Sequence, residues 1–185
     1  MKRIVLFASG SGSNVENIVN YFRNKGRNDL AFEVFTNNPS AGVIERAERL
    51  AIPYTVFNKE EFKAPSFLTK IENADLIVLA GFLWLIPMYM VKAFPNRMIN
   101  IHPALLPSYG GKGMYGDKVH KAVIANKEKQ SGISIHYVNE KYDEGLILLQ
   151  AKCMIEVEDT AESLAAKIHD LEYCYFPIII EQLVK

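Results

Sequence analysis

The feature that most constrains the fold of this chain is a set of short apolar runs without polar alternation, of which Ile4–Phe7 and Leu76–Leu79 are the clearest. A strand with one face in water alternates apolar and polar residues, whereas a strand covered on both faces does not. Amphipathic stretches follow these runs, as expected of helices that cover a sheet. The sequence therefore predicts an α/β fold, with helices on both faces of a Rossmann-like, mostly parallel sheet.

The apolar pattern also places the elements. Parallel strands are expected at Arg3–Ala8, Ala31–Thr36, Tyr54–Phe57, Asp75–Ala80 and Met98–Ile101. Helices are expected near Asn14–Asn24, Ala41–Leu50, Phe62–Ile71, Pro87–Ala93 and Lys118–Asn126. Ile133–Val138 and Leu146–Met154 are joined by a loop too short for a crossover helix, so they should form an antiparallel hairpin. A last helix should begin near Thr160 and bend or break near Pro177.

Composition narrows the class of protein. The 185 residues fit one domain, and no repeat or linker divides residues 1–185. The 21 basic and 21 acidic side chains give a formal charge of zero, which argues against nucleic acid or an anionic membrane as the main partner. The first apolar run is too short for a signal peptide or membrane span, so a cytoplasmic location is expected. Cys153 and Cys174 have no metal-ligand spacing and are expected to be reduced core residues.

Asn100 and His102 are the first candidate for chemistry. They stand two residues apart at the end of a predicted strand, and this spacing sends both side chains to one face. An amide beside a titratable ring suits a reaction that places negative charge on a carbonyl oxygen and moves a proton near neutral pH. The alternative is a polar strand end, at which Pro103 stops the hydrogen-bond ladder.

The segment Ser9-Gly10-Ser11-Gly12-Ser13-Asn14 lies between the first strand and the first helix. Small residues let backbone N–H groups approach a ligand, and a helix N-terminus favours an anion such as a phosphate. The segment lacks the dinucleotide pattern and the lysine of a nucleotide triphosphatase loop. The alternative is a plain cap in which Ser13 or Asn14 starts the helix. A β-branched residue at Gly12 should block the ligand and leave the fold intact.

Asp143 lies in the loop of the predicted hairpin. Its carboxylate could hold the ring N–H of His102 and raise the pKa of that histidine, or it could cap a solvated turn. His120 is expected on a helix surface, and His136 and His169 could be packed or exposed. The histidine spacing predicts no metal site.

Five segments then resemble, in order, the signatures of the phosphoribosylglycinamide formyltransferase family of folate-dependent formyltransferases. They are Phe7–Asn14, Val78–Phe82, Asn100–Pro107, Ser131–His136 and Asp143–Gly145. The resemblance extends from Lys2 to about Pro177. It implies formyl transfer from the co-substrate 10-formyltetrahydrofolate to the amine of glycinamide ribonucleotide, in purine synthesis and with no metal. Both partners are small molecules, and the enzyme would be a monomer or homodimer.

The same resemblance implies the site residues. The catalytic residues would be Asn100, His102 and Asp143. The ribonucleotide would be held by Gly12, Ser13, Asn14 and Glu172, and the folate by Leu83, Trp84, Leu85, Ile86, Asn100, Glu140 and Tyr142. The chain would thus be one formyltransferase domain, with a phosphate-binding N-terminal half and a folate-binding, catalytic C-terminal half.

The chain also departs from the family pattern. Gly110–Gly116 is longer and richer in glycine than usual, Trp84 stands where a basic residue is common, and no arginine is found near Lys63. Three alternatives stay open: a methionyl-tRNA formyltransferase, a formyltetrahydrofolate deformylase that uses water, and a non-enzymatic phosphate-binding module. We expect no room for the extra domain that either of the first two carries. The third would not need Asn100, His102 and Asp143 together.

Overall fold

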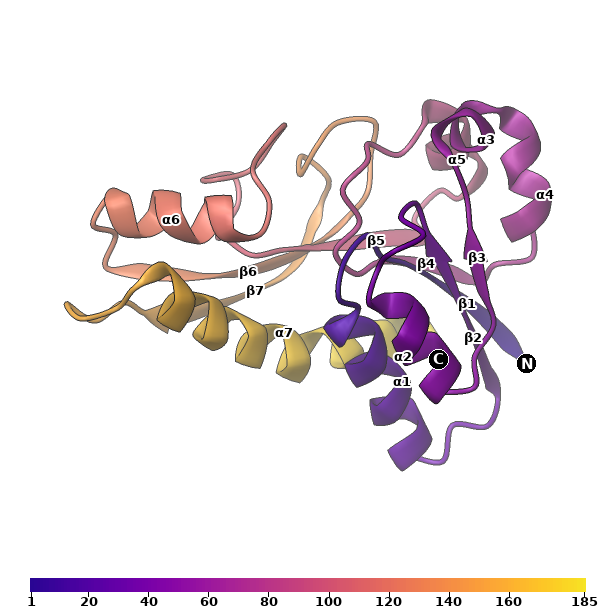
Figure 1. Cartoon of the computed structure of the whole chain (residues 1–185), viewed down its shortest axis with the longest axis horizontal. Helices are drawn as coiled ribbons and strands as arrows, with labels where there is room; N and C mark the ends of the chain where they lie inside the picture. Colours follow the sequence, from indigo (N-terminus) through magenta and orange to yellow (C-terminus); the bar gives the residue numbers. More distant parts are fainter.

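The computed structural model describes all 185 residues, and its seven strands form one sheet in the order β3-β2-β1-β4-β5-β6-β7 (Figure 1). The strands are β1 (Lys2–Phe7), β2 (Leu30–Thr36), β3 (Tyr54–Val56), β4 (Leu76–Leu79), β5 (Met98–His102), β6 (Gln130–Tyr137) and β7 (Ile147–Met154). The first five pair in parallel and the last two antiparallel. The predicted fold class and C-terminal hairpin are therefore confirmed.

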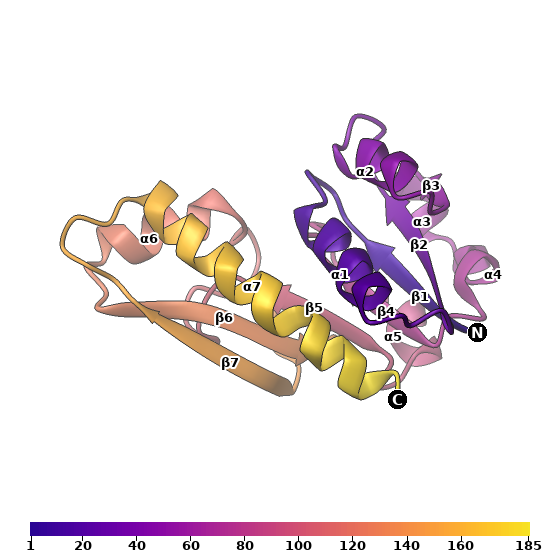
Figure 2. The same cartoon turned by 90° about the horizontal axis from the view of Figure 1, so that it is seen from below.

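Helices cover both faces of the sheet. They are α1 (Ser13–Asn24), α2 (Val43–Arg49), α3 (Lys59–Lys63), α4 (Leu68–Ile71), α5 (Met88–Ala93), α6 (Asp117–Ala125) and α7 (Ala161–Leu183). Residues of α1, α2, α6 and α7 share one apolar core with the sheet, and α3, α4 and α5 share a second on the opposite face. Figure 2 shows α1 and α7 together on the first face. Central strands such as β1 and β4 carry no polar alternation because both of their faces are covered.

Two predicted helices differ from the structure. The segment expected as one helix at Phe62–Ile71 is α3, a 3₁₀ turn at Pro65–Phe67 and then α4. Ala64 before the proline is extended, which ends α3, and a capping box between Asn58 and Glu61 starts it early. The sequence predicts a bend or a break near Pro177, and the break is wrong because α7 continues through this residue. Packing of its buried face against the sheet and α1 holds this helix together.

The strand order places a ligand crevice. Strand β1 lies between β2 and β4, so the chain leaves β1 toward one edge of the sheet and later returns to build the other. In open α/β sheets, ligands bind beyond the carboxyl ends of the strands at this switch point. The loops after β1 and β4 meet there, since Ser9 N donates to Gly81 O at 3.0 Å and Leu83 N donates to Ser9 Oγ at 3.1 Å.

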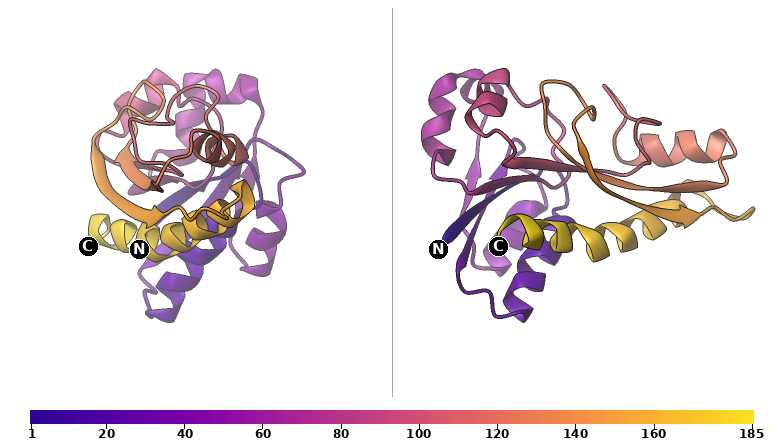
Figure 3. Two further views of the ribbon diagram at one scale, coloured as in Figure 1. Left: turned by 90° about the vertical axis from the view of Figure 1, so that its left-hand side faces the viewer. Right: turned by 180° about the vertical axis from the view of Figure 1, so that it is seen from behind.

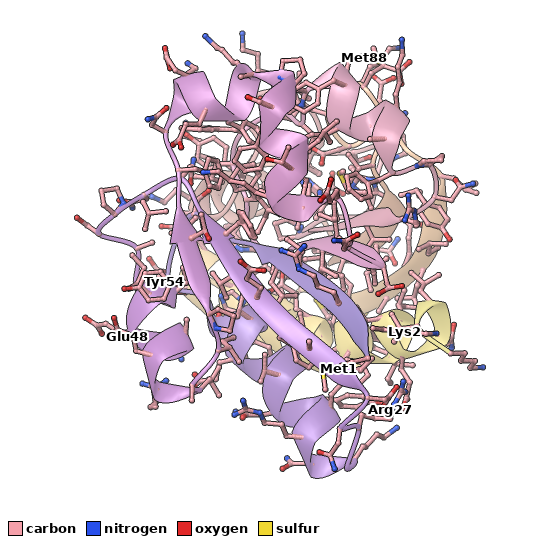
Figure 4. The ribbon with its side chains drawn as sticks, turned by 90° about the vertical axis from the view of Figure 1, so that its right-hand side faces the viewer. Met1, Lys2, Arg27, Glu48, Tyr54 and Met88 are labelled. Carbon is pink, nitrogen blue, oxygen red and sulfur yellow. The ribbon has the colours of Figure 1, made fainter.

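The sheet edge at β3 lies away from this crevice. There the Tyr54 hydroxyl donates to Glu48 of α2 at 3.1 Å, and the two side chains lie close together in Figure 4. None of the helices combines the length and the apolar character needed to cross a lipid bilayer.

Candidate active site

A cavity of about 610 Å³ opens at the carboxyl ends of β1, β4 and β5. The loops after these strands line it, together with the β6–β7 loop and residues of α6 and α7. The β6–β7 loop and the segment before α6 project from the same side of the sheet, as the view from behind in Figure 3 shows. One cavity thus takes side chains from segments far apart in the sequence.

Asn100 and His102 lie on one face of β5, as predicted. The antiparallel register of β6 places His136 opposite Asn100 and Ser134 opposite His102. His102 is 4 % exposed and His136 is 2 % exposed. Asn100, His102 and His136 therefore face the cavity from strands, which position side chains more rigidly than loops do.

Asp143 completes this cluster from the β6–β7 loop. Its Oδ2 accepts from Gly111 N at 2.9 Å, and its Oδ1 accepts from Asn100 Nδ2 at 3.3 Å. It also lies 3.6 Å from a ring nitrogen of His102 and 3.6 Å from one of His136. Only 10 % of its side chain is exposed, so the alternative of a solvated turn is wrong.

The hydrogen bonds of His102 assign its ring protons. Nε2 lies 2.8 Å from the carbonyl oxygen of Tyr109, which can only accept, so Nε2 carries a proton. In the neutral ring Nδ1 then holds the lone pair, and it faces Asp143. Burial lowers the pKa of His102, and this outweighs the opposite effect of Asp143. The expectation that the carboxylate gives His102 a raised pKa is therefore wrong in its net direction.

Asp143 itself stays ionised. Burial raises the pKa of this carboxyl, but His136, His102 and the N–H of Gly111 together lower it below its ordinary value. His136 Nδ1 lies 2.8 Å from the carbonyl oxygen of Tyr137, so Nδ1 donates and Nε2 accepts from Asn100 Nδ2 at 3.1 Å. Both hydrogens of the Asn100 amide are thus directed at His136 and Asp143.

The N-terminus of α1 forms another part of the cavity wall. Its N-cap is Gly12 at φ 76°, and no side chain caps the helix. The alternative in which Ser13 or Asn14 caps it is therefore wrong, and the first N–H groups of α1 remain available to an anion. A Cβ added at Gly12 would lie 2.4 Å from Val43 Cγ2. The expectation of an intact fold after a β-branched substitution at Gly12 is therefore wrong.

Glu172 of α7 lines the cavity beside the N-terminus of α1. It is 5 % exposed, and its Oε2 accepts from Asn14 Nδ2 at 2.9 Å. The same oxygen lies 2.9 Å from His169 Nδ1, and this hydrogen bond raises the pKa of His169. Asn14 Oδ1 is buried without a partner. A carboxylate and a free amide oxygen are acceptors suited to ligand hydroxyl groups.

An apolar wall runs along the loop after β4. Leu83, Trp84, Leu85 and Ile86 line the cavity, and Leu83 and Leu85 are 46 % and 41 % exposed. Tyr142 lines it from the opposite loop, whereas Glu140 is exposed and is not among the lining residues. A flat and largely apolar ligand fits such a wall.

Sequence reasoning missed three lining histidines. His120 was expected on a helix surface, but it is 3 % exposed and lines the cavity. His136 and His169 line it as well. The position of His136 could have been predicted, because the alternation along β6 places it on the same face of the sheet as Asn100. Cys174 is exposed and not in the core, and neither cysteine forms a disulfide. The structure brings together no group of three side chains able to hold a metal ion.

The fold and this cavity define the class of protein. Residues 2–180 match the model of the formyl transferase family, so the chain belongs to that family. Two relatives carry a more specific description. The chain is 35% identical to the phosphoribosylglycinamide formyltransferase of Bacillus subtilis, over 100% of this chain and 95% of that protein. It is 40% identical to a chloroplastic phosphoribosylglycinamide formyltransferase of Arabidopsis thaliana, over 96% of this chain but only 64% of the plant protein.

Solved structures agree with these relatives. The phosphoribosylglycinamide formyltransferase of Bacillus halodurans superposes with a TM-score of 0.88 at 31% identity, covering 100% of this chain and 96% of that one. The enzyme of the same name from Streptococcus pneumoniae gives 0.85 at 30% identity, with both chains fully covered.

Proposed function

We propose that this protein transfers a formyl group from 10-formyltetrahydrofolate to the amine of glycinamide ribonucleotide, a step of purine biosynthesis. The observation that carries the proposal is that one cavity holds both an uncapped helix N-terminus and the cluster of Asn100, His102 and Asp143. The first suits the phosphate of a ribonucleotide, and the second suits proton transfer beside a developing oxyanion. Membership of the formyl transferase family and the names of the relatives support the same reaction.

Each ligand has a place in this proposal. Backbone N–H groups at Gly12, Ser13 and Asn14 hold the phosphate, and Glu172 accepts from the ribose hydroxyls. The apolar wall Leu83–Ile86 and Tyr142 hold the pterin beside Asn100, and the exposed Glu140 acts only if the β6–β7 loop closes. The whole of residues 1–185 then acts as one formyltransferase domain.

The chemistry follows from the assigned protons. The neutral amine attacks the formyl carbon, and the new ammonium loses a proton to Nδ1 of His102, because Nε2 already carries a proton held by Tyr109. Asp143 stabilises the imidazolium that forms. The Asn100 amide donates to the formyl oxygen. It gives up its 3.3 Å hydrogen bond to Asp143 for this, because that bond is longer than its 3.1 Å hydrogen bond to His136. The proton then passes from His102 to the leaving folate nitrogen as the C–N bond breaks.

The test is release of tetrahydrofolate on mixing protein, formyl donor and glycinamide ribonucleotide. We expect release to depend on the ribonucleotide, with formylglycinamide ribonucleotide formed in equal amount. Equally fast release without the ribonucleotide would identify water as the acceptor and contradict the proposal. Binding of the ribonucleotide with no formyl transfer would leave only a binding module.

A further inference from the structure

His120 is a buried polar group that the mechanism above does not use. It lies in the first turns of α6, lines the cavity and is 3 % exposed. Its Nδ1 is shielded from solvent and has no hydrogen-bond partner in the chain. Buried polar atoms in native proteins nearly always have partners, so an unpaired one in a cavity wall calls for a partner from outside the chain.

The charged and titratable neighbours of His120 locate it within the cavity. Burial lowers the pKa of His120, His169 and His102 lower it further, and Glu172 and Asp117 act in the opposite direction. His120, Glu172 and His102 all line the same cavity, Glu172 at the end assigned to the ribose and His102 at the end assigned to the reacting amine.

The protonation of His120 defines what it can bind. A neutral imidazole has one N–H donor and one lone-pair acceptor. Between its ribose and its amine, glycinamide ribonucleotide carries an amide, which offers one carbonyl acceptor and one N–H donor. Asn14 Oδ1, at the ribose side of the same cavity, is a second buried polar atom without a partner in the chain.

We propose that the His120 imidazole, in the cavity that it shares with Glu172 and His102, binds the amide that links ribose to the reacting amine and so aligns this amine for attack. The proposal rests on the proposed function, because it takes glycinamide ribonucleotide as the ligand. It makes His120 a recognition group for the acyl-amide part of the substrate rather than for its ribose phosphate.

The experiment is calorimetric titration of the folded protein with two ligands, glycinamide ribonucleotide and ribose 5-phosphate, which lacks the amide. We expect His120→Phe, which keeps a ring but no polar atom, to weaken binding of the ribonucleotide by roughly 10-fold to 100-fold, the usual effect of one lost hydrogen bond to a buried group. Binding of ribose 5-phosphate should be unchanged. His120→Gln, which keeps a donor and an acceptor, should recover much of the loss. His120→Leu, which also has no polar side-chain atom, takes the place of the Phe variant if that variant does not fold.

Ser131→Ala is the matched control. Ser131 Oγ is also a buried polar atom without a partner, but Ser131 does not line the cavity, so this variant should bind both ligands as wild type does. Equal losses for both ligands in His120→Phe would place the contact at the ribose and overturn the proposal. Unchanged binding in both His120 variants would overturn it too, while the wild type still formylates its substrate. A wild type that binds no ribonucleotide at all would overturn the proposed function with it.

Discussion

His102 faces Asp143 through Nδ1 and Oδ2 at 3.6 Å, a separation longer than a hydrogen bond. The carboxylate therefore acts on the ring through its charge, and burial sets the net direction of the pKa of His102. A neutral His102 in the ligand-free protein is a base, ready to accept a proton at the nitrogen that faces Asp143.

The pH profile of Asp143→Asn tests this role. We expect wild-type kcat/KM to fall at acid pH with an apparent pKa below the ordinary 6.5 of histidine, because His102 must be neutral and burial lowers its pKa. Loss of the carboxylate lowers this pKa further, so the acid limb should move to lower pH and the plateau should drop. Steady-state rates from pH 5 to 9 measure both effects.

The double variant with His102→Ala provides the control. If Asp143 acts through His102, the double variant should be little slower than His102→Ala alone. Fully additive losses would give Asp143 a separate task. A rate in Asp143→Asn that recovers as the pH is lowered would show that the protonated ring is the active form.

Asn100→Ala should lower kcat by about 10² to 10³, the typical effect of deleting one oxyanion donor, with little change in the affinity for either ligand. Single-turnover rates, together with Kd values from calorimetry, separate the two quantities. His136→Gln leaves the Asn100 amide in place, and so it should cost less than Asn100→Ala. Wild-type turnover in Asn100→Ala would remove this residue from the chemistry.

Glycine substitutions in the loop after β1 separate ligand binding from folding. An added Cβ at Gly10 meets nothing within 4 Å, whereas one at Gly12 meets Val43 at a positive φ. Gly10→Val should therefore raise the KM for the ribonucleotide in a protein of nearly unchanged melting temperature. Gly12→Val should lower the melting temperature as well. An unchanged KM in Gly10→Val would show that the ribonucleotide does not approach Gly10, which lines the same cavity as Gly12.

Glu172→Gln should return the pKa of His169 toward 6.5, because the hydrogen bond from His169 to Glu172 is the largest cause of its raised value. In the wild type, the protonated His169 stabilises the folded state fully below pH 6.5. This stabilisation is lost as the pH rises through the raised folded-state pKa of His169, and the pH dependence should vanish in the variant. NMR titration of the His169 ring protons measures the pKa. The effect on stability is small, since 49% of the side chain is exposed.

The parts of the site that lie on strands could be predicted from the sequence. The period of two puts Asn100 and His102 on one face, and unbroken apolar runs such as Leu76–Leu79 require a sheet covered on both sides. Both are local properties of a few consecutive residues.

Other parts depend on contacts between distant segments. Asp143 is buried because Gly111, 32 residues earlier, donates to it, and no local pattern contains that pairing. His120 faces the cavity because of how α6 packs against α7, which the glycine-rich segment before α6 does not reveal. Pro177 stays within a helix because tertiary packing outweighs its local preference.

The Gly111 hydrogen bond to Asp143 also bears on inhibitor design. It joins the glycine-rich segment to the β6–β7 loop through the same carboxylate that supports His102. A compound wedged between these two loops would draw Asp143 away from the imidazole, and so it would disable the reaction. Resistance by substitution of Asp143 would itself cost activity.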